Sequence, residues 1–346
     1  MNKAMEDVIV VIGGGPAGME ASLSLAGRGH KVYLVEKANA LGGHLARWDR
    51  LFPRQDPAQE ILNDMLNGIR NADDKIEVIC NAQVQSVKKR IRGLEVMLSN
   101  QKQILADAVL VCCGFDLFRA ERKEEYGYGI YDNVLTSADL EDRFKHKKVL
   151  CADGRVPERV AFVHCVGSRD EKVDHNYCSK VCCVTAVKQA CEIKDLYPQT
   201  EVFNLYMDLR MFDRYFEQMY HKAQSHYGVH FVRGRLSEVS ETADGKLQIK
   251  TEDTLLGRPM KLTVDMLVLM VGMQACAQTE ELAEKLDLKV SSSDHFLETK
   301  DLFLKGNYAH TKGIFLAGAC TGPKSLPDTL QDARSAAESI HRYLTD

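Results

Sequence analysis

The sequence lacks a long apolar run, an excess of basic side chains and any Cys-x-x-Cys pair. Its formal net charge is −4, from 45 basic and 49 acidic residues, which excludes the basic surface of a nucleic-acid-binding protein. No stretch approaches the roughly 20 apolar residues of a membrane-spanning helix, so we expect no insertion into a membrane. The first residues, as far as Asp7, also lack the basic, apolar and small-residue order of an export signal. We therefore expect a cytoplasmic protein.

The sequence also has no solenoid repeat, low-complexity tract or heptad run, which excludes repeat and coiled-coil architectures. Its 346 residues suggest about two domains. Hydrophobic residues make up 45% and charged residues 27%, as in ordinary globular proteins. Eleven cysteines are present. Because a secreted disulfide scaffold is shorter and denser in cysteine, grouped cysteines here indicate metal, cluster or redox chemistry.

A dinucleotide-binding motif opens the chain. Residues 8–12 form a β-branched apolar run, typical of a buried parallel strand, and Gly13-x-Gly15-x-x-Gly18 follows directly. Gly13 allows the tight turn, Gly15 leaves room for a pyrophosphate at a helix N-terminus, and Gly18 lets helix and strand pack closely. The next predicted strand ends at Glu36, whose carboxylate can bind a ribose.

Three further segments resemble FAD-binding proteins of the disulfide-reductase type, in the same order along the chain. They are the acid and Gly-Gly pair of residues 36–43, the strand end at 110–115 and the segment 313–318. An Asp usually follows the last glycine of this third motif, whereas Ala319 stands here. The matches favour FAD over NAD. The residues expected to bind FAD are Gly13, Gly15, Pro16, Ala17, Gly18, Glu36, Lys37, Gly42, Gly43, His44, Val84, Cys113, Gly114, Phe115, Gly318, Ala319, Thr321, Gly322 and Lys324.

Two features of those reductases are missing. They need a redox-active cysteine pair, usually Cys-x-x-Cys, and a second glycine-rich loop for NAD(P)H. Residues 163–169, at the expected place of that loop, contain only Gly167. The predicted architecture therefore lacks both the site that takes up a hydride and the dithiol that passes electrons to a disulfide.

Four cysteines lie close together in the domain that has lost this loop. Cys165, Cys178, Cys182 and Cys183 fall within 19 residues, and the last three are expected on a helix from about Cys178 to Leu196. Four thiolates suit a [4Fe–4S] cluster or tetrahedral zinc. The alternative is a set of buried core cysteines on an amphipathic helix. We expect the remaining cysteines to be packing residues, three of them near the flavin: Cys112, Cys113 and Cys320, and elsewhere Cys80, Cys151, Cys191 and Cys276.

Three segments resemble the A-type subunits of the heterodisulfide reductases. They are Cys-Val-Gly-Ser-Arg-Asp-Glu-Lys from Cys165, the run 177–190 with its Cys-x3-Cys-Cys, and residues 318–328. The resemblance implies an α/β fold of two Rossmann-like, disulfide-reductase-like domains, the second inserted in the first. The FAD domain is expected at 1–116 and 277–346, and the inserted domain, carrying the iron–sulfur site, at 117–276.

The resemblance also implies an FAD-binding electron-transfer protein, an oxidoreductase, with a [4Fe–4S] cluster on Cys165, Cys178, Cys182 and Cys183. The chain resembles the compact form found in sulfur-oxidising heterodisulfide-reductase-like complexes, without the extra cluster and ferredoxin modules of longer members. B- and C-type iron–sulfur subunits are the expected partners, and a homodimer is the expected assembly.

Two lysines are candidates for tuning the flavin, since a cation near its ring stabilises the reduced anion. Lys188 lies on the predicted cysteine helix and Lys324 in the C-terminal flavin motif. A salt-bridged or solvated lysine is the alternative at both positions. Two other functions remain open: a stand-alone NAD(P)H-dependent disulfide reductase and a zinc-stabilised FAD-binding scaffold.

Overall fold

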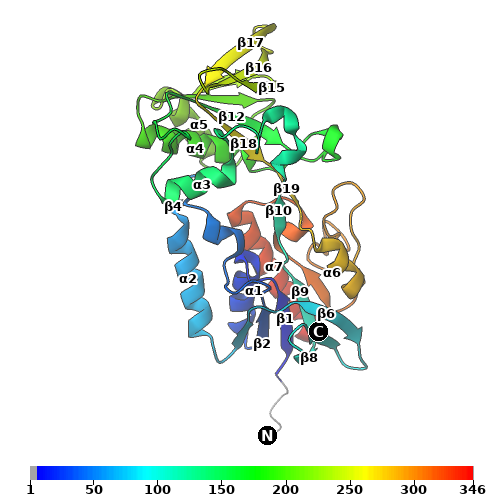
Figure 1. Ribbon diagram of the computed structural model, residues 1–346. Helices are drawn as coiled ribbons and strands as arrows, with labels where there is room; N and C mark the ends of the chain where they lie inside the picture. Colours follow the sequence, from blue (N-terminus) through cyan, green and yellow to red (C-terminus); the bar gives the residue numbers. More distant parts are fainter. Residues whose placement is uncertain (1–5, 346) are drawn as a thin grey trace. The chain divides into compact units, whose positions relative to one another are not determined.

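The computed structural model describes residues 6–345, which divide into two compact units (Figure 1). The first unit holds the chain up to Ala46, residues 59–116 and residues from 274 onward. The second unit holds residues 47–58 and 117–273. Residues 47–58 were expected in the first domain, whereas their contacts group them with the second unit.

The first unit is built on a five-stranded parallel sheet in the order β20-β9-β1-β2-β5. Its strands are β1 (Val8–Ile12), β2 (Lys31–Val35), β5 (Ile76–Ile79), β9 (Ala108–Val111) and β20 (Ile314–Leu316). Four of the five residues of β1 are buried. A continuous β-branched run has this burial because the strand has neighbours on both sides and cover on both faces.

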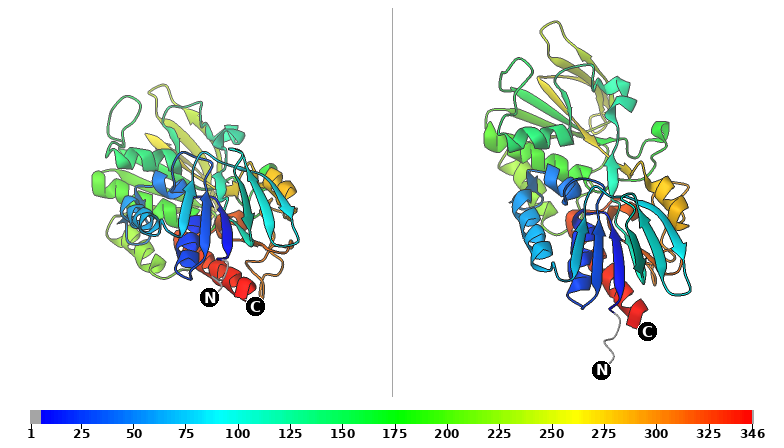
Figure 2. Two further views of the ribbon diagram at one scale, coloured as in Figure 1. Left: turned by 90° about the horizontal axis from the view of Figure 1, so that it is seen from below. Right: turned by 60° about the horizontal axis from the view of Figure 1, so that its bottom comes forward.

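The two faces of this sheet are covered differently. Val10 and Ile12 share a hydrophobic cluster with an antiparallel sheet of β6 (Val84–Lys89), β7 (Leu94–Leu98) and β8 (Gln103–Ala106). The alternate residue Val11 lies toward α1. Helices α1 and α7 lie side by side (Figure 2). The helices of this unit are α1 (Pro16–Ala26), α2 (Ala58–Asn71), α6 (Thr279–Leu286) and α7 (Leu326–Thr345).

The second unit repeats the parallel arrangement, in the order β11-β18-β12-β13-β14. The strands are β11 (Val134–Thr136), β12 (Arg159–Val166), β13 (Glu201–Tyr206), β14 (His230–Arg233) and β18 (Met266–Val271). An antiparallel sheet adds β15 (Leu236–Glu241), β16 (Leu247–Asp253) and β17 (Arg258–Val264). The helices are α3 (Ser137–Lys145), α4 (Cys182–Leu196) and α5 (Phe216–Ser225). Two parallel sheets with helices confirm the predicted α/β fold class.

Short elements complete the chain. β3 (Arg50–Leu51) pairs with β4 (Asp56–Pro57), and β10 (Phe115–Leu117) pairs with β19 (Met273–Ala275). A 3-10 helix, η5, covers Gly318–Thr321. Within residues 6–345 no helix is long and apolar enough to span a bilayer.

The start of α4 differs from the prediction. The helix begins at Cys182, so Cys178 lies in the preceding loop and does not share a helical face with Cys182. The reason is local, because Lys180 has a left-handed backbone with φ of 59°. A residue in this conformation cannot continue a right-handed helix. Cys182 and Cys183 therefore occupy the first turn of α4.

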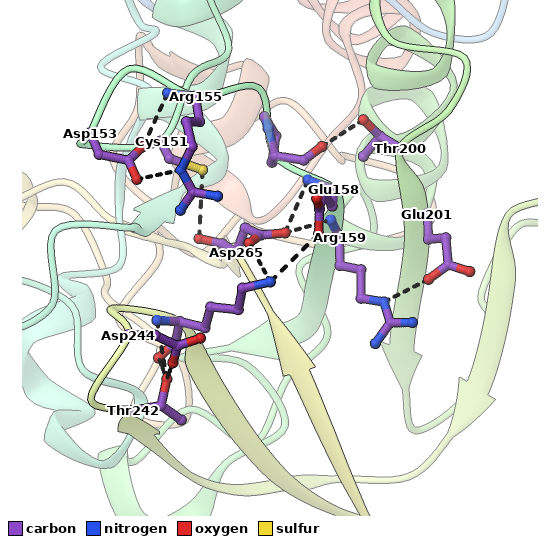
Figure 3. A network of polar contacts seen from close by, with 12 residues as sticks. Cys151, Asp153, Arg155, Glu158, Arg159, Thr200, Glu201, Thr242, Asp244 and Asp265 are labelled. Carbon is purple, nitrogen blue, oxygen red and sulfur yellow. Dashed lines mark hydrogen bonds and ion pairs between the residues drawn. The ribbon is translucent and has the colours of Figure 1, made fainter.

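A buried carboxylate fixes the amino ends of two strands of the second unit. Asp265 is 3% exposed, and its Oδ2 accepts hydrogen bonds from the amides of Glu158 at 3.0 Å and Arg159 at 2.8 Å (Figure 3). The Lys246 ammonium lies 3.5 Å from the other oxygen. Burying an unpaired charge costs free energy. These three donors compensate the charge of Asp265 and so stabilise its buried position between β12 and β18.

A second buried network attaches residues 47–58 to the second unit. The Lys188 ammonium of α4 forms an ion pair with Glu141 of α3, lies 3.2 Å from Glu192, and donates to the Arg50 carbonyl at 2.9 Å. Glu141 also accepts the Asp49 amide at 2.9 Å. The side chains of Lys188, Glu141 and Glu192 are nearly inaccessible, so removing one charge would leave another unpaired.

The pKa values of Glu192 and Lys188 are both raised, for different reasons. Desolvation raises the pKa of Glu192 to about 8, and the neighbouring Glu141 adds to the rise. Burial disfavours the charge on Lys188, but the carboxyl groups of Glu192 and Glu141 raise its pKa overall. The lysine charge is therefore engaged by acids within its own unit.

We expect this network to make stability depend on pH. The folded state binds the Glu192 proton more tightly than the unfolded chain, whose pKa is near the ordinary 4.5. Stability contributed by this proton is present below pH 4.5 and is lost as the pH rises to about 8, by up to about 1.4 kcal/mol per pH unit. Glu192→Gln should flatten this slope in urea unfolding at pH 5, 6.5 and 8. Glu217→Gln, an exposed site on α5, is the control. An unchanged slope in Glu192→Gln would contradict the assignment.

Candidate functional site

The glycine motif of the first unit combines two packed glycines with an open one. A Cβ on Gly13, whose φ is +108°, would lie 2.3 Å from the carbonyl oxygen of Cys112. A Cβ on Gly18 would lie 1.9 Å from the carbonyl oxygen of Gly13. A Cβ on Gly15, the N-cap of α1, would meet nothing within 4 Å. The free volume thus lies at the amino end of the helix, where backbone amides and the helix dipole favour an anion.

Glu36 braces this loop from the end of β2. Its carboxylate is 8% exposed and accepts the amide of Gly14 at 2.6 Å and the amide of Ala38 at 2.7 Å. Each carboxylate oxygen has a further lone pair available for a ligand hydroxyl. The predicted ribose acceptor therefore lies beside the glycine loop.

The second glycine pair closes on the same loop. Gly42 donates to the carbonyl of Gly14 at 2.8 Å, and a Cβ on Gly43 would lie 3.2 Å from Cα of Gly15. Both have positive φ, +123° and +52°. The strain-free positive φ of glycine lets residues 41–43 approach the helix start.

The strand end after β9 lies within the same unit. The His44 ring stacks on the Phe115 ring at 4.3 Å, and its Nε2 lies 2.9 Å from the Phe115 carbonyl oxygen. Gly114 has φ of +75°, and a Cβ there would meet nothing within 4 Å. Cys113 is half-buried, and the neighbouring thiols of Cys276 and Cys320, together with burial, raise its pKa well above the ordinary value.

The C-terminal motif lies against α1. A Cβ on Gly318 would be 2.7 Å from Cβ of Ala17. The Lys324 ammonium donates to the carbonyl of Gly318 at 3.0 Å and to Oγ1 of Thr321 at 2.6 Å. Ala319 is buried, and Gly322 has open space around it. Lys324 thus stabilises the 3-10 turn of the motif.

Asp332 is a functional candidate that the sequence reasoning missed. Its Oδ2 accepts the amide of Gly318 at 2.8 Å and lies 3.4 Å from the Lys324 ammonium. In the C-terminal motif of FAD-binding proteins of the disulfide-reductase type, an Asp usually follows this glycine directly, whereas Ala319 stands here. A carboxylate from α7 therefore reaches the same glycine from 14 residues further along the chain. The feature of the sequence that could have indicated this role is an acidic residue in the second turn of α7, the C-terminal helix.

Two predicted cofactor residues lie elsewhere in the first unit. The Lys37 ammonium is at the surface and donates to Oε1 of Gln278 at 3.0 Å. Val84 is 4% exposed and belongs to the hydrophobic cluster beneath the antiparallel sheet. Neither is brought into contact with the glycine loop by a described hydrogen bond.

In the second unit, three of the four predicted ligand cysteines come together. Cys165 ends β12 with its sulfur 3.9 Å from that of Cys182, and Cys183 follows in the first turn of α4. All three are buried. Cys178 lies in the loop, where its sulfur accepts the amide of Lys180 at 3.3 Å. Among residues 6–345, no three His, Cys, Asp or Glu side chains are already arranged as metal ligands.

The electrostatics favour thiolates at Cys165 and Cys183 but a protonated thiol at Cys182. The neighbouring Cys182 thiol and the His164 imidazole lower the pKa of Cys183 to about 4. A hydrogen bond from Cys182 lowers the pKa of Cys165 to about 7, while the pKa of Cys182 is raised well above its ordinary value. The first turn of a helix adds to this stabilisation of negative charge. By chemistry, the donor set suits a soft metal centre.

The space of the lost nucleotide loop is filled. Gly167 follows β12 with φ of +72°, and a Cβ there would lie 2.0 Å from the Phe118 ring. Phe118 is itself 2% exposed. An aromatic ring therefore lies beneath the turn at which a second dinucleotide motif would need a glycine loop.

Comparisons with known proteins show what this chain is similar to. Residues 9–136 match the family described as pyridine nucleotide-disulphide oxidoreductase. The chain is 32% identical to the A-type iron-sulfur subunit of the CoB–CoM heterodisulfide reductase of Methanocaldococcus jannaschii, covering 96% of the chain and 63% of that protein. The chain is homologous to the A-type subunits of the heterodisulfide reductases. The corresponding ferredoxin:CoB–CoM heterodisulfide reductase protein of Methanosarcina mazei is 27% identical, over 99% of the chain and 54% of that protein.

The chain thus spans less than two thirds of the length of these relatives. Its fold is shared with thioredoxin reductase of T. acidophilum, with a TM-score of 0.65 at 16% identity over 99% of this chain and 100% of that one. It is shared also with the flavoprotein disulfide reductase RclA of Escherichia coli, with a TM-score of 0.61 at 18% identity over 96% and 70%. These findings confirm the resemblance and the oxidoreductase class predicted from the sequence.

Two glycine variants should separate ligand binding from folding. Gly18→Ala brings a Cβ against a backbone oxygen and should lower the free energy of unfolding by about 3 kcal/mol. Gly15→Ala fills only open space, so it should unfold like the wild type but bind FAD about tenfold more weakly, about 1.4 kcal/mol. Urea unfolding and FAD titration of the flavin-free protein measure the two effects. Wild-type FAD affinity in a folded Gly15→Ala protein would exclude this loop as the FAD site.

Proposed function

We propose that this chain is an FAD- and [4Fe–4S]-dependent electron-transfer subunit of a heterodisulfide-reductase-like complex. One observation carries the proposal: each unit has a parallel strand followed by a helix start suited to negative charge. In the first unit that start is the open Gly15, and in the second it is the thiol pair Cys182 and Cys183. A chain with both features suits transfer of electrons between a flavin and a cluster.

The described residues of the first unit fit FAD. The volume at Gly15 and the amides of α1 would hold the pyrophosphate, and Glu36 would bind the ribose. The segments at Gly43 and Gly318 would border the remainder of the cofactor. FAD, when bound, supplies both one-electron and two-electron transfer. The role of the chain is to bind it, to orient it and to set its potential.

Lys324 is the better of the two proposed tuning residues. Its ammonium lies in the C-terminal flavin motif, where it holds the turn at Gly318. Lys188 instead pairs with Glu141 in the second unit, so its charge already serves a structural role there. We therefore propose Lys324, with Asp332 beside it, as the charged pair that acts on the flavin environment.

The second unit supplies a thiolate donor set. Cys165, Cys182 and Cys183 are buried, the sulfurs of Cys165 and Cys182 lie 3.9 Å apart, and the loop that carries Cys178 would add the fourth ligand. The same donor set would also accept zinc. The relatives' description as iron–sulfur subunits favours a [4Fe–4S] cluster. The Phe118 ring under Gly167 argues against NAD(P)H binding in this unit, and so against a stand-alone NAD(P)H-dependent reductase.

The remaining parts of the proposal concern the complex. B- and C-type iron–sulfur subunits would exchange electrons with this chain, in sulfur metabolism, and the disulfide substrate would be handled in a partner. We propose a cytoplasmic location and a homodimer for the chain itself. The names of the relatives, which include reductases of the CoB–CoM heterodisulfide, support this assignment.

Anaerobic purification followed by a visible spectrum and metal analysis tests the proposal. Flavin with about four irons and matching sulfide per chain is the expected result. Flavin with zinc and no iron would favour the scaffold function. Rapid bleaching of the flavin by NADH or NADPH without partners would favour the stand-alone reductase.

Cysteine variants assign the cluster. Cys182→Ser removes a thiol from the group and should abolish iron binding while FAD stays bound, because the first unit is untouched. Cys191→Ser changes a buried thiol on the same helix, two turns further on, and should retain iron. Iron content and flavin absorbance are measured on both. Equal iron in the two variants would contradict the ligand assignment.

A further inference from the structure

The backbone of the second unit fixes Arg169 close to the predicted ligand cysteines. A turn starts at Cys165, whose carbonyl accepts the amide of Ser168 at 3.2 Å, and Arg169 follows this turn directly. The Arg169 amide donates to the carbonyl of Tyr177, one residue before Cys178, at 3.0 Å. Arg169 has φ of 53°, a left-handed conformation that a residue with a side chain keeps only when its surroundings hold it there.

The guanidinium of Arg169 is held by an acid that also contacts a predicted ligand. Its Nη2 donates to Oδ2 of Asp208 at 2.7 Å, and the carbonyl oxygen of Asp208 lies 3.6 Å from the sulfur of Cys183. The other nitrogen, Nη1, is buried and has no hydrogen-bond partner among residues 6–345. Buried polar groups are normally hydrogen-bonded, so a charged donor in this position calls for an explanation.

Two further buried nitrogen atoms in this part of the unit lack partners. His164 directly precedes Cys165 in β12, and its Nε2 lies 2.9 Å from Oδ1 of Asn204 in β13. Nδ1 of His164 and Nδ2 of Asn204 have no hydrogen-bond partner within the described part of the chain. Both side chains are buried. Nitrogen atoms that can donate to sulfur thus border the same group of thiols on more than one element.

We propose that Arg169 tunes the iron–sulfur centre of the second unit, by donating its Nη1–H to a sulfur of that centre while Asp208 positions the guanidinium. This inference rests on the cluster function proposed above. Reduction adds a negative charge to a cluster, so a hydrogen bond from a cation stabilises the reduced form and raises the reduction potential. Arginine suits this role because its rigid fork can serve Asp208 with one nitrogen and a sulfur with the other.

Arg233 offers a matched control. Its guanidinium lies 3.4 Å from the other carboxylate oxygen of Asp208, but its side chain is 48% exposed, against 22% for Arg169. Loss of either arginine removes one positive charge and one contact to Asp208. Solvent and salt screen an exposed charge much more than a buried one. A comparison of the two positions therefore separates a hydrogen bond to the centre from a general effect of charge or of loop stability.

Redox titration of the full chain with its cofactors tests the proposal. Wild type, Arg169→Gln and Arg233→Gln are purified without oxygen, their iron, sulfide and FAD are measured, and the reduced cluster is followed by EPR. In Arg169→Gln we expect the ratio of reduced to oxidised cluster to fall about tenfold at a fixed solution potential, a shift of about 59 mV for one electron. Arg233→Gln should change this ratio less than about twofold, because its charge is screened.

A labelling experiment reads the contact directly. Arginine with heavy nitrogen in its guanidinium is incorporated, and the reduced cluster is examined by pulsed EPR. We expect a heavy-nitrogen coupling that is lost in Arg169→Lys and kept in Arg233→Lys. Arg169→Lys retains the positive charge, so it serves as the test if Arg169→Gln assembles no cluster.

The outcomes separate this inference from the function on which it rests. Iron-loaded Arg169→Gln with the wild-type potential overturns the inference alone, and so does an equal fall of the potential in Arg233→Gln. A wild-type spectrum without the heavy-nitrogen coupling, or a coupling that persists in Arg169→Lys, also overturns it alone. Wild-type protein with zinc in place of iron overturns both the inference and the proposed cluster function.

Discussion

The close approach of Gly18 to the carbonyl oxygen of Gly13 is the constraint on which the first unit depends. A side chain at Gly18 would place a carbon 1.9 Å from that oxygen, so only glycine lets α1 lie so near the end of β1. This contact sets the position of the α1 N-terminus, with Gly15 left open at its tip. The segments of Gly43 and Gly318 then approach the same helix start. One missing Cβ therefore determines where the nucleotide-binding elements of the unit can converge.

The second unit uses the same strand–helix geometry for different chemistry. Its first helix after β12 begins with Cys182 and Cys183, and the turn that would hold a pyrophosphate packs on the Phe118 ring. A helix N-terminus stabilises negative charge of any kind, on a phosphate or on a thiolate. A dinucleotide-binding geometry can thus carry thiolates with little change of backbone. The buried His164 beside Cys183 adds to the same electrostatic preference.

Local patterns predicted most of the fold. The β-branched run of β1, the spacing of the three glycines and the acid at Glu36 depend on neighbours in the chain, and the structure has each in the expected place. The prediction was wrong at the start of α4, because the left-handed backbone of Lys180 leaves no signature in composition or periodicity. It also could not assign residues 47–58, whose attachment depends on the buried ammonium of Lys188.

The sequence by itself determined most of the elements and the glycine loop, because these depend on spacing along one strand, turn or helix. Only the tertiary structure decided which distant groups meet, as Asp332 does with Gly318 and Glu141 with Lys188. The physical reason is that strand order and helix packing, not separation along the chain, set these distances. Burial then sets the protonation of the groups that meet, and no sequence motif records it.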